Sequence, residues 1–259
     1  MVLLLALLHG CGVVAKVPIS WPFDVVINTG FAPQCDELRL PDDGKRRVVV
    51  LQHGIWRTSA SLWRLERTLR AHGYEVWNEG YPSLTETIEQ AAARLAAVVE
   101  RIRARPVDEL AFVGHSMGGL VIQEYLRRPD AVDPARCVYL ATPHRGAVLA
   151  DLRKHWWLFR LCMGDRAALQ LSPGDPLHER PILWRDRSGA LVGTLGEGNG
   201  SIPGDDDGTV AVREARLEGA AAELVLPYGH TRMGMHPEVC RQVLHFLGRG
   251  AFAAAGTAR

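Results

Sequence analysis

From residue 47 onwards, apolar and polar positions follow two alternating patterns along the chain. Short runs rich in valine, leucine and aromatic residues predict strands that are covered on both faces of a sheet. These runs are residues 48–51, 74–77, 109–114, 137–141, 190–195 and 223–226. Segments between and after them have apolar residues at helical spacing, which predicts helices over residues 61–72, 87–105, 119–128 and 237–247. This alternation predicts an α/β fold with a mostly parallel, doubly wound sheet and helices on both faces.

Two segments depart from these patterns. Residues 17–47 are irregular and contain several prolines, and two short candidate strands there, 25–28 and 37–40, are left unassigned. Residues 144–189 leave the strand–helix alternation and contain the densest aromatic and apolar patch of the chain, residues 155–163. We expect one domain over residues 17–250, with an insertion at about 144–189, and a frayed Ala/Gly-rich tail over 251–259.

The first residues read MVLLLALLHGC, an apolar stretch that ends in a small residue and Cys11. This stretch resembles a bacterial lipoprotein signal, in which Cys11 would be lipidated and residues 1–16 would form a leader. The resemblance implies a cell-envelope protein, periplasmic or anchored to a membrane through Cys11. The run is too short to span a bilayer. The alternative is an apolar N-terminal helix docked on the fold, in a cytoplasmic protein.

Composition narrows the function classes. The 30 basic and 29 acidic residues nearly cancel, which leaves no electrostatic footprint for binding nucleic acid. The five cysteines include no CxxC pair, so a metal or dithiol motif is not expected. If Cys11 is acylated, the four others could form disulfides in an oxidising compartment, although Cys137 and Cys240 are more simply read as buried thiols. Those four are Cys35, Cys137, Cys162 and Cys240. The sequence leaves the oligomeric state open.

The clearest chemical motif joins the predicted strand 109–114 to the helix that follows. It reads Gly114-His115-Ser116-Met117-Gly118-Gly119 and places a serine at the apex of a sharp turn. The glycines Gly114 and Gly118 are expected because a Cβ there would collide with the neighbouring strand or helix. The alternative is a glycine-rich strand-to-helix turn in which Ser116 has no catalytic role.

This motif resembles the nucleophile elbow of the α/β-hydrolase superfamily, in particular bacterial serine lipases and esterases. The resemblance implies an α/β-hydrolase fold in which Ser116 is the nucleophile. It also implies that the insertion after the strand ending near Ala141 is a cap or lid over the serine. With Trp156 and Trp157, this lid would suit acyl chains, or the same residues form the cap's own core.

The superfamily order of serine, acid and histidine directs the search for the partners of Ser116. Asp207 immediately precedes a glycine in the loop 203–210, as in the lipase Asp-Gly-x-Val element, with Asp205 and Asp206 as reserves. The alternatives are a solvated acidic turn or a Ca²⁺-binding loop. His230 follows the last predicted strand and is the expected base. Other histidines near the C-terminus are His236, before the last helix, and His245, within it.

The segment Gln52-His53-Gly54-Ile55 resembles the His-Gly-hydrophobic element of lipases. The resemblance assigns the oxyanion hole to the backbone N–H groups of Ile55 and Met117; the alternative is a plain strand end. Tyr81-Pro82-Ser83 is expected at the rim. The positions expected to bind substrate are His53, Gly54, Trp56, His115, His144, Trp156 and Trp157.

Together these motifs imply a serine carboxylic-ester hydrolase that works through an acyl-enzyme on a small-molecule or lipid ester with a hydrophobic acyl group. No metal or organic cofactor is expected. A thioesterase, amidase or acyltransferase would use the same residues, because such motifs do not encode the leaving group or the acceptor. An alternative of another class is an envelope-anchored binding protein that keeps the fold without catalysis.

Overall fold

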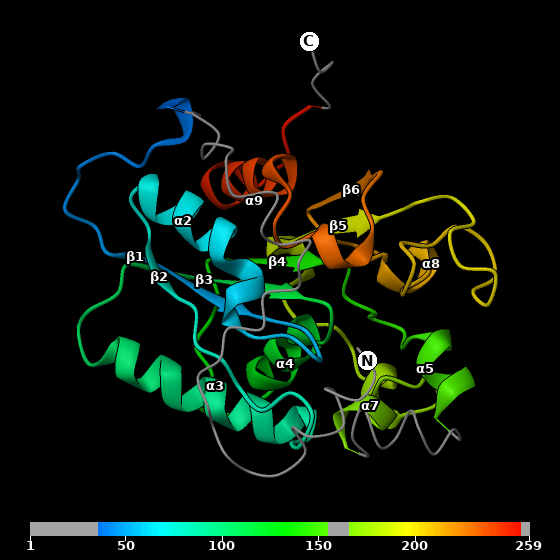
Figure 1. Cartoon of the computed structure of the whole chain (residues 1–259). Coiled ribbons are helices and arrows are strands. Elements are labelled where there is room, and N and C mark those ends of the chain that lie inside the picture. The colour runs from blue at the N-terminus through cyan, green and yellow to red at the C-terminus, as the bar shows by residue number, and fades with distance from the viewer. Residues whose placement is uncertain (1–35, 155–165, 255–259) are drawn as a thin grey trace, which may run out of the picture. The chain divides into compact units, whose positions relative to one another are not determined.

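Six parallel strands form one sheet, in the order β2-β1-β3-β4-β5-β6, in the computed structural model of the chain (Figure 1). The structure describes residues 36–154 and 166–254, and all its elements belong to one unit, Ala32–Arg259. The strands are β1 (Arg47–Gln52), β2 (Glu75–Trp77), β3 (Glu109–His115), β4 (Arg136–Leu140), β5 (Ser188–Gly193) and β6 (Ala222–Leu226). The predicted parallel sheet is confirmed.

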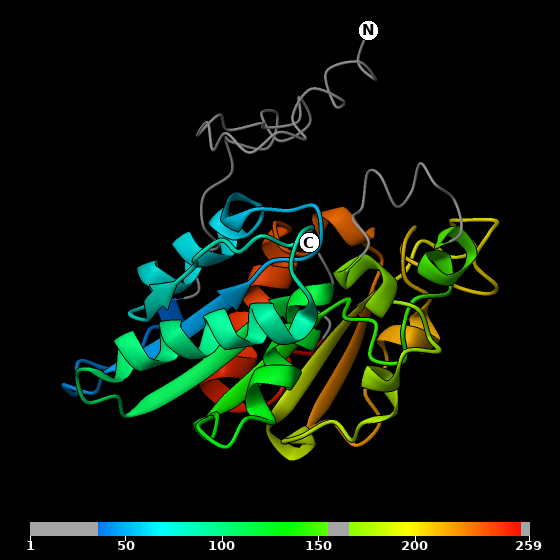
Figure 2. The ribbon, with the colours of Figure 1, turned by 90° about the horizontal axis from the view of Figure 1, so that it is seen from below.

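Helices cover both faces of the sheet (Figures 1 and 2). On one face lie α2 (Trp63–Ala71) and α9 (Pro237–Arg249), and on the other α3 (Ile88–Arg103) and α4 (Met117–Leu126). Strand β1 shows why its apolar run is continuous. Val48 and Val50 pack in the core on the α3 and α4 side, whereas Val49 and Leu51 pack on the α2 and α9 side. Both faces of the strand are therefore buried, as the run predicts.

The strand order reverses next to β1. The chain first leaves β1 for β2 and then crosses back to β3, which pairs with β1 on its other side. In open α/β sheets, ligands bind at the carboxyl ends of strands at such a reversal. The loop after β1 and the turn after β3 are thus neighbours at the edge where a ligand site is expected.

The connection between β4 and β5 carries the predicted insertion. Its described part contains α5 (Val148–Arg153), α7 (Ala167–Gln170) and two 3-10 turns, η4 (Pro176–Glu179) and η5 (Arg185–Arg187). Gln170 connects the insertion to α3, because its Oε1 accepts the Ile88 N–H at 2.8 Å. Residues 155–165, with Trp156, Trp157 and Cys162, lie outside the described residues.

Shorter elements complete the described chain. They are η2 (Asp36–Leu38), η3 (Ser59–Leu62), α8 (Val212–Ala215) and η6 (His230–Arg232). The unassigned segment 37–40 thus begins as a 3-10 turn and is not a strand. The predicted leader 1–16 with Cys11, the candidate strand 25–28, Cys35 and residues 255–259 of the tail all lie outside the described residues.

The cysteines and the helices of the described part bear on two further expectations. Cys137 and Cys240 are free and buried, as predicted, and burial raises the pKa of both thiols to about 12. Within residues 36–154 and 166–254, no helix has the length and apolar content needed to cross a membrane.

Candidate active site

Ser116 lies at the sharp turn between β3 and α4. Its backbone has φ 55° and ψ −128°, a left-handed conformation that L-residues rarely adopt. The neighbouring glycines make the turn possible. A Cβ on Gly114 would come within 2.5 Å of the Gly119 backbone, and one on Gly118 would overlap the carbonyl oxygen of Gln52. The predicted need for glycine at 114 and 118 is thus confirmed, and the hydroxyl lies at the N-terminus of α4.

His230 lies next to Ser116 although 114 residues separate them. Its Nε2 is 2.9 Å from Ser116 Oγ, and its Nδ1 is 2.7 Å from Asp207 Oδ2. All three side chains are buried. Because a carboxylate only accepts, the proton of the neutral ring is on Nδ1, and Nε2 is left to accept from the hydroxyl. We call Ser116, His230 and Asp207 the candidate triad.

The second oxygen of Asp207 is also satisfied. Oδ1 accepts the N–H groups of Thr209 at 3.0 Å and Val210 at 2.7 Å, which orients Oδ2 toward His230. The two reserve carboxylates lie elsewhere: Asp205 is exposed, and the buried Asp206 accepts the N–H groups of Gly208 and Asn199. The structure therefore brings Asp207 to His230, whereas Asp206 binds backbone within the loop and Asp205 is exposed.

The loop after β1 approaches the serine closely. A Cβ on Gly54 would lie 2.9 Å from Ser116 Cβ, so this position needs a glycine. Among the described residues, neither the N–H of Ile55 nor that of Met117 has a hydrogen-bond acceptor. Both amides flank the serine, at the start of a turn and at the first residue of α4. Two such free donors beside a nucleophile can bind a developing oxyanion.

A sequence model of the alpha/beta hydrolase family matches residues 48–249. The chain belongs to this family. No curated protein sequence matches the chain. Solved structures share the fold of this hydrolase at low identity. One is the mature lipase BlEst2 from Bacillus licheniformis, with a TM-score of 0.60, 21% identity, and coverage of 75% of this chain and 89% of that chain.

Two further solved structures with the same fold are described as a carboxyl esterase and a thioesterase. The metagenomic carboxyl esterase MGS0156 has a TM-score of 0.53 and 19% identity, over 74% of this chain and 66% of that one. The thioesterase RedJ of the prodiginine pathway in Streptomyces coelicolor has a TM-score of 0.52 and 20% identity, over 78% of this chain and 89% of that one.

In this α/β hydrolase, the His53 ring forms hydrogen bonds that hold the loop after β1. Its Nδ1 donates to the Gly54 carbonyl oxygen at 2.9 Å, and its Nε2 accepts the Tyr81 N–H at 3.2 Å. The Tyr81 hydroxyl donates to the His53 carbonyl oxygen at 2.7 Å, and the two rings stack at 4.3 Å. Both ring nitrogens of His53 are hydrogen-bonded and the ring is buried, so His53 holds the loop in place. Its contact with substrate stays a prediction. Burial also lowers its pKa.

The other positions expected to bind substrate have different surroundings. Trp56 has φ 61° and is 48% exposed, directly after Ile55. His144 is buried, meets the edge of the Tyr139 ring at 4.9 Å, and has no partner for either ring nitrogen among the described residues. Burial, with the nearby charges of His178 and Arg185, lowers the pKa of His144 to about 3, so the ring is neutral. His115 is buried beside His230.

Two histidines near the C-terminus have structural contacts. The His236 ring stacks on Tyr228 at 3.6 Å, and its Nδ1 accepts the Glu238 N–H at the start of α9. His245 Nδ1 donates to the Ala251 carbonyl oxygen. In the described part of the chain, no group of three or more His, Cys, Asp or Glu side chains is arranged to hold a metal ion.

One link within the site has no counterpart among the sequence motifs. The guanidinium of Arg57 donates to Thr231 Oγ1 at 2.8 Å, which joins the loop after β1 to the turn that carries His230. Both residues are close in sequence to motif positions, but no local pattern indicates that they pair. Adjacency to Ile55 and His230 was the available signal.

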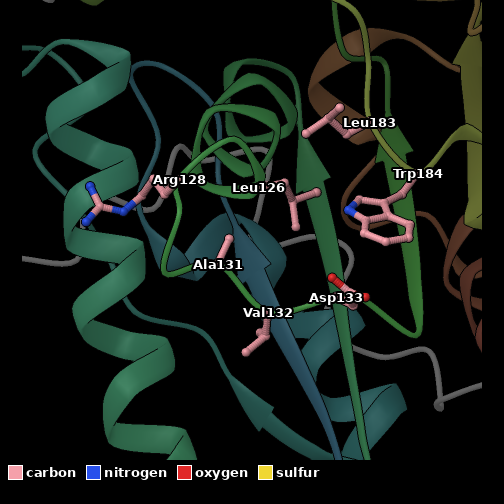
Figure 3. Close-up of a pocket in the computed structure, with 7 residues that line it drawn as sticks. All are labelled: Leu126, Arg128, Ala131, Val132, Asp133, Leu183 and Trp184. Atoms are coloured by element: carbon pink, nitrogen blue, oxygen red, sulfur yellow. The ribbon is translucent and has the colours of Figure 1, made fainter.

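Figure 3 shows the residues that line a cavity of about 390 Å³. This cavity lies at the end of the sheet opposite to the candidate triad. It is located near the C-terminus of α4 and before β4 and β5, whereas Ser116 is at the N-terminus of α4. Its lining shares no residue with the candidate triad or the loop after β1. The lining residues are Leu126, Arg128, Ala131, Val132, Asp133, Leu183 and Trp184.

Proposed function

We propose that this α/β hydrolase is a serine carboxylic-ester hydrolase, an esterase or lipase that acts through an acyl-enzyme. One observation carries the proposal: the continuous hydrogen-bonded path from Ser116 Oγ to His230 at 2.9 Å and from His230 to Asp207 at 2.7 Å. A serine hydroxyl is a weak nucleophile until a base removes its proton, and the carboxylate stabilises the imidazolium that results.

The first half of the reaction transfers the acyl group to the enzyme. Ser116 Oγ attacks the ester carbonyl carbon while its proton moves to His230 Nε2. The carbonyl oxygen becomes an oxyanion that the N–H groups of Ile55 and Met117 bind, and each such donor contributes about 3–4 kcal/mol to the transition state. When the intermediate collapses, His230 returns the proton to the departing alcohol, and an ester to Ser116 remains.

The second half repeats these steps with water. His230 Nε2 takes a proton from the water as the water oxygen attacks the acyl carbon. The new oxyanion occupies the same two N–H groups. Collapse breaks the bond to Ser116 Oγ, which recovers its proton from His230, and the carboxylic acid leaves. No step needs a group beyond those of the chain, the ester and water.

An ester with a hydrophobic acyl group is the proposed substrate class. Its support is the half-exposed Trp56 directly after Ile55, since an aromatic side chain beside a site can contact apolar groups. The descriptions of two structural neighbours as a lipase and a carboxyl esterase point the same way. The thioesterase neighbour keeps thioester hydrolysis as the second candidate, because it shares the fold to a similar degree.

Hydrolysis of p-nitrophenyl esters of increasing chain length, alongside matched thioester and anilide substrates, tests the proposal. Ser116→Ala is the inactive variant. Ser172→Ala is the matched control, because Ser172 is also buried and lies beside Lys154 and Asp151 in the cap. We expect ester turnover and fluorophosphonate labelling in the wild type and in Ser172→Ala, and neither in Ser116→Ala.

Each other outcome has a defined meaning. Faster turnover of thioesters or anilides than of esters identifies a thioesterase or amidase. Product that appears only with an added alcohol or amine acceptor identifies an acyltransferase. An unlabelled wild type with no turnover identifies a binding protein with the fold of a hydrolase and overturns the proposal.

A further inference from the structure

His115 lies between the loop after β1 and the turn that carries His230. It is the last residue of β3 and directly precedes Ser116, and its side chain is 3% exposed. The His115 and His230 ring centroids are 5.0 Å apart, with 45° between the ring planes. On the other side, a Cβ on Gly54 would be 3.3 Å from His115 Nδ1. The imidazole thus contacts the loop after β1 and the turn that carries His230.

One hydrogen bond determines the protonation of this ring. His115 Nε2 lies 2.9 Å from the carbonyl oxygen of His230. Because a carbonyl oxygen only accepts, Nε2 carries the proton, and Nδ1 has no partner in the part of the chain that the structure describes. Burial and the neighbouring His230 hold the pKa of His115 well below its ordinary value. The ring is a neutral donor whose N–H is directed at the backbone of His230.

The backbone of His230 is held from two directions. Its N–H donates to the Asp207 carbonyl oxygen at 2.8 Å, so the acid loop holds one side of the residue. Its carbonyl oxygen accepts from His115 and, at 3.4 Å within the same turn, from the N–H of Met233. The bond from His115 therefore joins the His230 backbone to the strand that ends in Ser116.

We propose that His115 is a positioning residue, whose Nε2–H holds the His230 main chain so that the imidazole stays within reach of Ser116 Oγ. The proposal rests on the proposed serine hydrolase mechanism. Two other side-chain hydrogen bonds hold the turn that carries His230: one joins the His230 ring to Ser116, and the other joins Thr231 to Arg57 in the loop after β1. The bond from His115 differs from both because it acts on the main chain of His230 and not on a side chain.

Two amide substitutions distinguish positioning from simple packing. In His115→Gln, the amide nitrogen reaches approximately the place of Nε2 and can still donate to the His230 carbonyl oxygen. In His115→Asn, the shorter amide places its nitrogen near Nδ1, and the His230 carbonyl oxygen loses the donor from position 115. Both variants are neutral and polar, so they differ mainly in where the donor lies. His115→Leu removes the donor altogether.

The measurement is kcat and KM on a p-nitrophenyl ester, with thermal unfolding recorded for every variant. We expect kcat to fall on the order of 100-fold in His115→Asn and His115→Leu with little change in KM, since a misplacement of about 1 Å has such an effect. We expect His115→Gln to recover most of the lost kcat. Wild type and Ser116→Ala, measured in the same series, test the underlying mechanism separately.

The outcomes distinguish failure of the positioning role from failure of the hydrolase mechanism. An active wild type in which the Gln and Asn variants have equal kcat overturns the positioning role and leaves the hydrolase mechanism intact. The positioning role is likewise overturned if activity in all variants tracks their melting temperatures, or if the loss is in KM. A wild type as inactive as Ser116→Ala overturns both proposals. If a variant does not fold at the assay temperature, fluorophosphonate labelling rates at a lower temperature give the same Gln-to-Asn comparison.

Discussion

Arg57 donates a hydrogen bond of 2.8 Å from its guanidinium to Thr231 Oγ1. The two residues are 174 positions apart, and each is next to a part of the proposed machinery. Arg57 follows the turn that begins at Ile55, and Thr231 follows His230. The bond therefore joins the loop that would offer an oxyanion donor to the turn that carries the proposed base.

Replacing Thr231 tests the value of this link. Thr231→Val keeps the shape of the side chain and removes the acceptor, whereas Thr231→Ser keeps the acceptor. We expect Thr231→Val to lower kcat about 3–10-fold, because an exposed hydrogen bond to a charged group contributes on the order of 1 kcal/mol. Stopped-assay kinetics on a soluble ester measure it. Equal kcat in the Val and Ser variants would show that the link has no part in turnover.

The three consecutive aspartates should separate by kinetics. Asp207→Asn removes the negative charge from the carboxylate bonded to His230, and kcat should fall on the order of 10⁴-fold, as for other triads. Asp205→Asn, at an exposed position, should resemble wild type. A larger kcat loss for Asp205→Asn or Asp206→Asn than for Asp207→Asn would refute the assignment.

Asp206 should affect stability more than chemistry. Its buried carboxylate accepts two backbone N–H groups, from Gly208 and Asn199, and an amide oxygen replaces only one of the two acceptors. We expect Asp206→Asn to lower the free energy of unfolding by about 1–3 kcal/mol. Urea titration measures this, with the exposed Asp205→Asn as the matched control.

Gly119 offers a test of packing at the nucleophile turn. A Cβ there would overlap the side chain of Thr142, so Gly119→Ala should destabilise the fold by about 1–3 kcal/mol through overpacking. Thr142→Ala removes the two closest atoms and should recover part of this loss in a double-mutant cycle. In Gly118→Ala the obstacle is the backbone of Gln52, and Thr142→Ala should give no recovery. Additive effects for Gly119 and Thr142 would contradict the close contact.

The buried His144 predicts acid sensitivity. Its pKa falls from the ordinary 6.5 to about 3 on folding, so between these pH values the unfolded chain binds a proton here that the folded chain does not. Stability therefore decreases as the pH drops below 6.5, by up to about 1.4 kcal/mol per pH unit from this residue. His53 and His115, whose pKa values are also lowered, contribute in the same direction.

His144→Leu removes this contribution, and urea titrations from about pH 8 to about pH 4 measure it. We expect the variant's unfolding free energy to decrease less steeply with falling pH than that of wild type. The difference at about pH 8, where the wild-type ring is neutral in both the folded and the unfolded chain, reports packing alone and serves as the internal reference. Parallel curves over the whole range would show that His144 does not remain neutral in the folded protein.

The apolar pattern predicted every strand of the sheet, and its errors have physical reasons. Residues 190–195 were expected as a strand, whereas β5 runs over Ser188–Gly193. Ser188 and Gly189 give no apolar signal, yet Phe246 and Phe252 close over Gly189 and bury this end. Leu195 extends the apolar run but is 56% exposed, since the chain has already left the sheet. Burial depends on distant partners, which a local pattern does not contain.

In the candidate site too, the sequence predicted the features that depend on local motifs and missed those that depend on distant contacts. Motif order was sufficient to select Ser116 and His230, which the structure brings to 2.9 Å. The resemblance to the Asp-Gly-x-Val element favoured Asp207 and kept Asp205 and Asp206 as reserves, because sequence context does not show which way adjacent side chains point; in the structure, the carboxylate beside His230 is that of Asp207. The Nε2 atoms of His53 and His115 form their hydrogen bonds with main-chain atoms of Tyr81 and His230. Any residue type could supply those atoms, so no motif marks them.

The placement of the acid and the base toward one edge of the sheet has a consequence for how the protein would lose activity. Asp207 and His230 follow β5 and β6, while Ser116 and Ile55 follow the more central pair β3 and β1. Strand β6 is at the rim, and its Glu223 and Val225 face solvent. Local opening of that rim would withdraw the proton acceptor from an otherwise intact nucleophile turn. We therefore expect warming to abolish catalytic activity reversibly at temperatures at which the central strands are still folded.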